Sequence, residues 1–427
     1  MAGFPFADRI EYLKAPQPTS EADDARVREI VAGVRRDVAE RGDAALREYT
    51  RQFDGVDVDE LRVSAADIAA ARQACTADLL DGMQFAIERI TAFARAQLAM
   101  LHPLEIEVLP GVHLGHRLIP LQRVGAYVPG GRYPLLSAPL MAIIPAKVAG
   151  VDEIHVCTPP KVHPAVLYAA HLAGATQIYR VGGAQAIAAF TFGTETIPRV
   201  DKICGPGNMY VNEAKRQAIG YVGIDQLAGP SEIFVLADDT ADPKILAADL
   251  LAQAEHDPET RVGLITTSRR IGEATLHEVE RQLGLLSTAQ VAGAAWNKRG
   301  EIVLCQNEAD MILYSDYVAP EHLQVHTANA EALSTQLRNY GSLFIGQDSS
   351  VVYSDKVSGT NHILPTGGAA HYTGGVWVGT FLKVCTHQRI ERNGVEVLAE
   401  YSVRQSANEG LEGHRKAAEI RVNYDVV

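Results

Sequence analysis

Residues 151–192 read VDEIHVCTPPKVHPAVLYAAHLAGATQIYRVGGAQAIAAFTF, and short β-branched runs alternate in this stretch with helix-length segments. The short runs are Ile154–Val156 and Gln177–Val181, and the longer segments are His163–Ala173 and Ala184–Phe192. Strands that alternate with helices are typical of parallel sheets with crossover connections. The sequence therefore predicts an α/β domain around this stretch.

A second alternating block begins at Ile233–Leu236, continues with a helix from Pro243 to about Glu255 and reaches another strand at Val262–Ile265. Further strands are expected at 302–305, 323–325 and 343–345. Before both blocks, from about residue 21 to 98, apolar side chains recur at three- and four-residue steps, which is typical of helices. The predicted fold class is α/β, with two Rossmann-like parallel-sheet domains, a helical N-terminal segment and a C-terminal dimerisation arm.

The two blocks meet near Asp225–Ser231, which sets the expected domain boundaries. One α/β domain is predicted at 126–232, and the other is built from 20–125 plus 233–380. Residues 1–19 are an N-terminal extension. Residues 381–427 are polar and helical in texture and hold too few apolar side chains for a core, so we expect this arm to pack on something else, for example a partner subunit.

Composition excludes several classes of protein. The 427 residues are 47 % hydrophobic and 21 % charged, near the averages of folded proteins. With 39 basic and 52 acidic residues the net charge is −13, which disfavours binding to nucleic acid. The most apolar stretch is broken by prolines and a lysine, so neither a membrane span nor a signal peptide is expected. Five scattered cysteines indicate a reducing, cytoplasmic setting.

Three glycine-rich turns follow predicted strands, at Val128–Gly131, Val181–Gln185 and Cys204–Asn208. Glycine at such a turn lets backbone N–H groups and a helix N-terminus approach an anionic or dinucleotide ligand. None of the turns is a complete G-x-G-x-x-G motif, and no Walker lysine follows, which disfavours ATP or GTP chemistry. Each turn alone is also compatible with a simple tight turn at a strand end.

Four polar clusters are candidates for chemistry. Gln253 and His256 lie three residues apart at a predicted helix end, where they are either metal ligands or a helix cap. Glu321 and His322 put an acid and a base at the start of a strand, suited to proton transfer or simply a solvated loop. The other two clusters are the binding-loop candidate formed by Asp355 and residues 358–362, and the pair Glu409 and His414, whose default position is an exposed helix face.

Taken in order, these motifs resemble the histidinol dehydrogenase family over roughly residues 20–422. Each motif is weak alone, but the ordered set is specific. The matching segments are Tyr127–Gly131, Val181–Ile187, Gly205–Asn208 with Glu213–Arg216, Ala228–Glu232, Gln253–His256, Pro320–His322 and Ser358–His362.

The resemblance implies a zinc- and NAD-dependent enzyme that oxidises a primary alcohol through an aldehyde to a carboxylate and reduces two NAD molecules. It assigns proton transfer to His322 and water activation to Glu321. The remaining implied roles fall into three sets: the metal ligands are Gln253, His256, Asp355 and, across a homodimer, His414; the substrate contacts are Ser231, His362 and Glu409; the NAD contacts are Tyr127, Gln185 and Asn208.

Three parts of the sequence bear on the substrate. Arg132–Ser137, His371–Phe381 and Lys356, next to Asp355, are more like family members that act on other alcohols, such as sulfopropanediol. A cation beside the pocket could pair with a sulfonate or carboxylate, although Arg132 is also compatible with a surface position. L-Histidinol and an anionic alcohol such as 2,3-dihydroxypropane-1-sulfonate are therefore both candidate substrates. A binding protein without turnover and a metal-dependent hydrolase remain as alternatives from other classes.

Overall fold

The computed structural model describes residues 5–17, 24–130 and 134–423. The chain separates into two compact units: the first comprises residues 1–96 and 121–381, and the second 97–120 and 382–427. Within the described residues no helix is long and apolar enough to cross a membrane. All five cysteines are free thiols.

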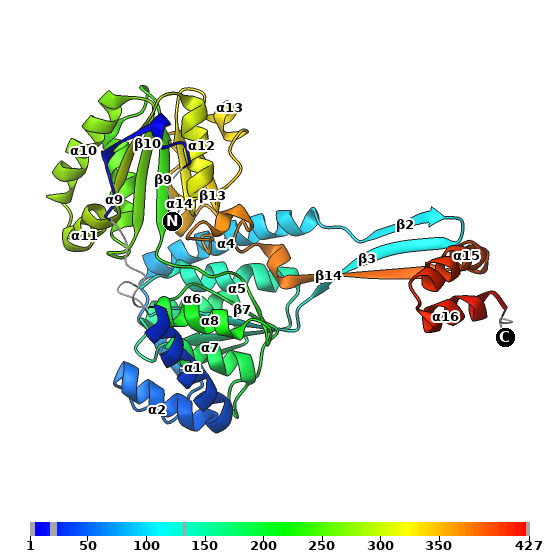
Figure 1. Ribbon diagram of the computed structural model, residues 1–427. Helices are drawn as coiled ribbons and strands as arrows, with labels where there is room; N and C mark the ends of the chain where they lie inside the picture. The colour runs from blue at the N-terminus through cyan, green and yellow to red at the C-terminus, as the bar shows by residue number, and fades with distance from the viewer. Residues whose placement is uncertain (1–4, 18–23, 131–133, 424–427) are drawn as a thin grey trace. The chain divides into compact units, whose positions relative to one another are not determined.

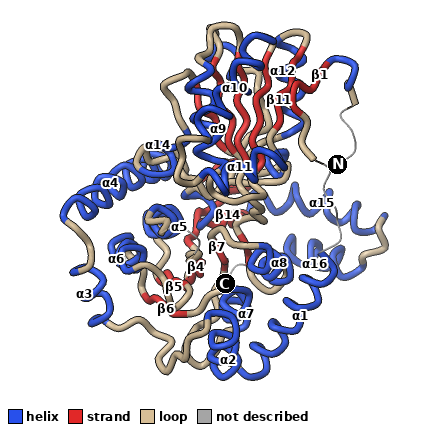
Figure 2. The backbone as a smooth tube through the Cα atoms, turned by 90° about the vertical axis from the view of Figure 1, so that its left-hand side faces the viewer, coloured by secondary structure: helices blue, strands red, loops and turns tan. Residues whose placement is uncertain are grey.

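The first unit contains a five-stranded, entirely parallel sheet in the order β6-β5-β4-β7-β8. Figure 2 labels β4, β5, β6 and β7 of this sheet, and Figure 1 labels β7. The chain first adds strands on one side of β4 and then on the other, so a topological switch point lies between β4 and β7. Ligands of open α/β sheets bind at the carboxyl edge beside such a point. The strands are β4 (Arg123–Tyr127), β5 (Glu153–Thr158), β6 (Gln177–Arg180), β7 (Lys202–Cys204) and β8 (Gly223–Ile224), joined through α5 (Ser137–Ala149), α6 (Pro164–Ala173), α7 (Gly183–Phe192) and α8 (Met209–Ala218).

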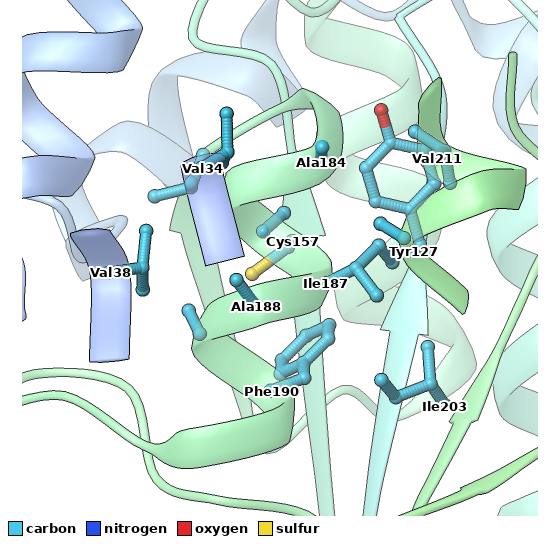
Figure 3. Close-up of a cluster of buried hydrophobic side chains, with 14 of the residues drawn as sticks. Val34, Val38, Tyr127, Cys157, Ala184, Ile187, Ala188, Phe190, Ile203 and Val211 are labelled. Atoms are coloured by element: carbon cyan, nitrogen blue, oxygen red, sulfur yellow. The ribbon is translucent and has the colours of Figure 1, made fainter. Parts of the chain in front are cut away.

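The N-terminal helices cover this same sheet. Valines at helical spacing on one face of α1 are buried in one cluster with side chains of α7, and Figure 3 shows Val34 and Val38 against Ala184 and Ala188. The helical pattern of the sequence is confirmed, but the first three of these helices pack on helices of the five-stranded sheet, where grouping with 233–380 was expected. Periodicity shows which face of a helix is apolar and not which sheet receives it. The helices are α1 (Asp24–Arg41), α2 (Asp43–Asp54), α3 (Ala65–Gln73) and α4 (Ala77–Ala99), of which the first three pack on α6, α7 or α8.

The second sheet of the first unit has the order β1-β11-β10-β9-β12-β13. Only β1 (Ile10–Lys14) runs antiparallel, on the edge, so part of the expected N-terminal extension is a strand. The parallel strands are β9 (Glu232–Ala237), β10 (Arg261–Thr266), β11 (Glu301–Cys305), β12 (His322–His326) and β13 (Ser342–Ile345). The helices are α9 (Pro243–Ala254), α10 (Arg269–Leu283), α11 (Ala289–Arg299), α12 (Glu308–Val318), α13 (Ala330–Ser334) and α14 (Val351–Lys356), with short 3-10 turns at Ala7–Arg9, Ala369–His371 and Val378–Phe381.

The second unit is an antiparallel sheet in the order β14-β3-β2 followed by two helices that pack on each other. The first residues of the expected arm form a strand, β14, rather than a helix, and residues 97–120 pair with it instead of joining the α/β domain. The elements are β2 (Leu104–Leu109), β3 (Val112–Pro120), β14 (Leu382–Ile390), α15 (Arg392–Asn408) and α16 (Glu412–Asn423).

Candidate active site

At the carboxyl edge of the five-stranded sheet, two of the glycine-rich turns pack against the same proline, Pro159. A Cβ atom on Gly130 or Gly182 would lie 2.9 or 2.8 Å from Cγ of Pro159, so side chains are excluded from both turns. Beside them lies the buried Tyr127, whose hydroxyl oxygen accepts a hydrogen bond of 3.1 Å from the backbone N–H of Gly183. Burial raises the pKa of Tyr127 to about 12, so this phenol stays neutral.

Two of the predicted NAD contacts lie at the starts of the helices that follow this edge. Gln185, in the first turn of α7, is buried, and its Oε1 has no hydrogen-bond partner among the described residues. Asn208 caps α8: its Oδ1 accepts from the backbone N–H groups of Tyr210 and Val211, both at 3.1 Å. Two helix N-termini and an unpaired buried acceptor form a cradle that fits a dinucleotide phosphate and its neighbouring polar groups.

A buried ion pair, which the sequence analysis missed, holds the Gly205 turn. Lys215 pairs with Asp225, and their side chains are 1 % and 0 % exposed. The Lys215 Nζ also donates to the Gly205 carbonyl at 3.0 Å, and the Gly205 N–H donates to Asp225 Oδ2 at 2.8 Å. A Cβ atom on Gly205, whose φ is +121°, would lie 2.1 Å from the Tyr127 carbonyl oxygen. A lysine inside an otherwise apolar helix face was the available signal.

Glu321 and His322 lie at the amino end of β12, beside the amino end of β9. Glu321 Oε2 accepts hydrogen bonds from the Ser231 hydroxyl at 2.7 Å and the Glu232 N–H at 2.8 Å. His322 Nδ1 lies 2.8 Å from the Glu232 carbonyl oxygen and 3.4 Å from Glu321 Oε2. The carbonyl can only accept, so Nδ1 carries the proton and Nε2 is the acceptor of the neutral ring.

The electrostatics of His322 suit a proton acceptor. The ring is 2 % exposed, and its Nε2 has no hydrogen-bond partner among the described residues. Burial alone lowers the pKa of His322, but the neighbouring Glu321 carboxylate and, less strongly, Asp355 outweigh it and raise the pKa to about 9. Glu232, missed as a site residue, supplies the backbone groups that hold both side chains.

The predicted metal ligands at the end of α9 are Gln253 and His256, and Gln253 is joined to Glu321 through Ser231. Gln253, 2 % exposed, donates from Nε2 to Ser231 Oγ at 2.6 Å, so Ser231 links it to Glu321. The bond fixes the amide with its NH₂ group toward Ser231, which leaves Oε1 as the atom available to a metal. His256 follows just after the helix, and its N–H donates to the Gln253 carbonyl at 3.1 Å.

Asp355 and His362 form the other side of the site. Asp355 is buried near the end of α14, and its Oδ1 lies 3.7 Å from His362 Nδ1, too far for a hydrogen bond. The loop that carries His362 is fixed on α5, because Asn361 Nδ2 donates to the Met141 carbonyl at 2.8 Å. Burial lowers the pKa of His362. Lys356 is exposed, and Arg132 lies outside the described residues.

The fourth predicted ligand, His414, and the predicted substrate contact Glu409 belong to the second unit, in α16 and at the C-cap of α15, and both are exposed. In the described part of the single chain, no three His, Cys, Asp or Glu side chains are grouped to hold a metal. The chemistry of the donors still fits zinc: the oriented Gln253 amide oxygen, the His256 imidazole and the Asp355 carboxylate are the mixed N/O ligands that an open site uses, with one position left to another element.

Comparison with known proteins matches this architecture along nearly the whole chain. A family model described as histidinol dehydrogenase matches residues 17–422. A histidinol dehydrogenase homolog from Shouchella clausii is 45 % identical over 417 residues, 96 % of this chain and 98 % of the relative. The sulfopropanediol 3-dehydrogenase of Ruegeria pomeroyi is 41 % identical over 419 residues, 97 % of this chain and 96 % of the relative.

Among solved structures, histidinol dehydrogenase from Elizabethkingia anophelis superposes with a TM-score of 0.90 at 39 % identity, covering 95 % of this chain and 94 % of that one. The resemblance read from the ordered motifs is confirmed by the family match. The α/β class with parallel sheets is confirmed by the fold. The chain belongs to the histidinol dehydrogenase family, NAD-dependent oxidoreductases that convert an alcohol to an acid.

Proposed function

We propose that the protein is a zinc- and NAD-dependent dehydrogenase that oxidises a small polar primary alcohol through an aldehyde to the carboxylate. The observation that carries the proposal is the linked set Gln253–Ser231–Glu321 beside a His322 ring whose buried Nε2 has no hydrogen-bond partner among the described residues. The sequential chemistry needs a base for the alcohol proton and a second group that activates water, and these two side chains meet that need within one buried cluster. Free cysteines and the absence of a membrane-spanning helix in the described residues are compatible with a cytoplasmic enzyme.

In the first half-reaction His322 takes the hydroxyl proton at Nε2, while the Glu232 carbonyl holds the ring through Nδ1. In the second, Glu321 takes a proton from the water that attacks the aldehyde. Its Oε2 is already held by Ser231 and Glu232, so the carboxylate is fixed before substrate enters. Zinc, bound by Gln253, His256, Asp355 and His414 of the partner subunit, would polarise the substrate oxygen.

NAD is assigned to the cradle at the carboxyl edge of the five-stranded sheet. Tyr127 contributes its ring face, because its hydroxyl is occupied by Gly183. Asn208 contributes Nδ2, because its Oδ1 caps α8. Gln185 contributes the buried amide oxygen that has no protein partner. Ser231, His362 and Glu409 are assigned to the substrate.

The second unit is proposed to join two chains into a homodimer in which its C-terminal helices complete the partner's site. Every residue of β2 is exposed, and many large apolar side chains of the second unit are exposed as well. So much exposed apolar surface is typical of a protein–protein interface. The large exposed apolar side chains are Met100, Leu104, Ile106, Val108, Leu109, Leu114, Ile119, Val384, Ile390, Val397, Tyr401, Leu411 and Ile420.

L-Histidinol is the first candidate substrate, with L-histidine as product. A second candidate, 2,3-dihydroxypropane-1-sulfonate oxidised to sulfolactate, is favoured by Lys356, a cation that lies close enough to His362 to lower its pKa. An imidazole substrate has no use for this cation, whereas a sulfonate would pair with it.

The test is the initial rate of NADH formation by the zinc-loaded enzyme with each alcohol, repeated with His322→Ala. Two NADH per L-histidinol, lost in the variant, are expected for the first assignment. Activity with the sulfonate alone, weakened in Lys356→Ala, would select the second. Hydrolytic turnover without NAD, or NAD binding without reduction by any alcohol, would contradict the proposal.

A further inference from the structure

Strand β12 carries a column of buried polar side chains on its α9 face. His322, Gln324 and His326 alternate with Leu323 and Val325, which belong to the apolar cluster on the opposite face of the sheet. The three polar residues are at most 3 % exposed. On the same face, their register partners on the neighbouring strand β9 are Ile233, Val235 and Ala237, all apolar.

Contacts of this column join the three elements that carry the candidate site. Gln324 Nε2 donates to the Ser349 carbonyl at 3.3 Å, which ties β12 to the start of α14. The Ser350 hydroxyl, which caps α14, donates to Asp249 Oδ1 on α9 at 2.7 Å. His326 Nε2 lies 3.9 Å from Asp249 Oδ2. Thus β12 bears His322, α9 bears Gln253 one helical turn after Asp249, and α14 bears Asp355.

The column is not arranged for maximal stability. Asp249 Oδ2, Gln324 Oε1 and both nitrogens of His326 are buried and have no hydrogen-bond partner among the described residues. Each such atom costs free energy, and apolar side chains of similar shape would avoid that cost. In return, the polar side chains form directional hydrogen bonds that join α9, α14 and β12, which apolar side chains cannot form.

We propose that Asp249, Ser350 and Gln324 are positioning residues: they fix α9 and α14 against β12 and so set Gln253 and Asp355 relative to His322. The inference rests on the proposed function for what these side chains do, and on the hydrogen bonds above for how they are held. Groups one layer behind ligands typically change metal affinity or activity by about 10- to 100-fold when removed.

The test compares two serines that make the same local bonds. Ser350 caps α14 and donates to Asp249, whereas Ser268 caps α10 and donates to Asp239, and α10 carries no site residue. Ser350→Ala and Ser268→Ala each remove one cap and one bond to a carboxylate. The readouts are kcat and KM, the Kd for Zn²⁺ measured by competition with a chelating dye, and amide hydrogen exchange along the chain.

Ser350→Ala is expected to lower kcat/KM and to raise the Kd for Zn²⁺ by about 10- to 100-fold each, and to speed exchange at the end of α9 as well as in α14. Ser350→Thr, which keeps the hydroxyl, should restore all three. Ser268→Ala should change kcat/KM less than about threefold and speed exchange in α10 only.

Equal effects of the two alanine variants on kcat/KM and Kd, or unchanged exchange at the end of α9 in Ser350→Ala, would overturn the positioning role. An inactive wild-type enzyme would instead refute the proposed function. In that case, hydrogen exchange still decides whether Ser350 couples α14 to α9.

Discussion

Replacing Lys215 with methionine removes the cation of the buried pair beneath the Gly205 turn. Methionine matches the lysine side chain up to Cε, so the loss is mainly that of the ammonium group: the Asp225 side chain, 0 % exposed, loses its counter-ion, and the Gly205 carbonyl loses a donor. Removing one partner of a buried pair costs about 3–5 kcal/mol. Asp225 retains the N–H groups of Gly205 and Gln226, so we expect the lower end, about 3 kcal/mol.

The cost is measured as the shift of the urea unfolding transition, and two companion variants are measured in the same way. Lys215→Met/Asp225→Asn leaves no unpaired charge, so it should lose less stability than Lys215→Met alone. Lys147→Met, at an exposed position of α5, should stay within about 0.5 kcal/mol of the wild type. Because the pair fixes the turn before Asn208, KM for NAD should rise in Lys215→Met more than kcat falls.

A cost below about 1 kcal/mol for Lys215→Met would be no more than the loss of an ordinary hydrogen bond, and would show that Asp225 does not depend on the Lys215 cation. A double variant no more stable than Lys215→Met would show that the buried, unpaired carboxylate is not the source of the loss.

Three further outcomes are expected. The rate of the first hydride step, measured by stopped-flow NADH formation, should rise with pH through about 9, since only neutral His322 accepts a proton. In Glu321→Gln this rise should occur at lower pH, because the carboxylate that raises the pKa of His322 is gone. A rise at the same pH in the variant would contradict this. Mixing inactive His322→Ala and His414→Ala chains under subunit exchange should restore about a quarter of the wild-type activity if the ligand comes from the partner, and none if it comes from the same chain. Gly205→Ala should raise KM for NAD and lower the melting temperature, because its Cβ atom meets the Tyr127 carbonyl at a φ of +121°; wild-type values for both would remove the turn from the NAD site.

Local pattern predicted the elements well because their periodicities are strong. The strands and helices of 153–192 and the block from Ile233 to Ile265 lie where alternation places them. What pattern could not give was the partner of each element. The valines of α1 suit either sheet equally in the sequence, and β14 reads as polar because most of its side chains are polar, which hides its pairing with β3.

Single residues of the candidate site could be picked out from the sequence, but the residues that hold them could not. Gln253, Glu321 and His322 stand out as polar groups at element ends, whereas Ser231 came only from the family resemblance. The structure joins Gln253, Ser231 and Glu321 by hydrogen bonds and places His322 Nδ1 3.4 Å from Glu321 Oε2. Residues that hold them were missed because each looks ordinary alone. Glu232 acts through its backbone, and Lys215 acquires meaning only when Asp225, on another element, is brought to it.

The link between the two sheets explains why the candidate site combines the carboxyl edge of the five-stranded sheet with the amino edge of the other sheet. β8 ends at Ile224 and β9 begins at Glu232, and residues 225–231 span at most about 25 Å when extended. A chain that leaves a carboxyl edge and enters the next strand so soon must place the amino edge of the second sheet near the carboxyl edge of the first.

Bonds along this link maintain that placement. Asp225 holds the Gly205 turn, the Ala228 N–H donates to Asn212 Oδ1 on α8 at 2.9 Å, and Ser231 donates to Glu321. The NAD cradle and the proton-transfer pair are therefore joined by one short segment.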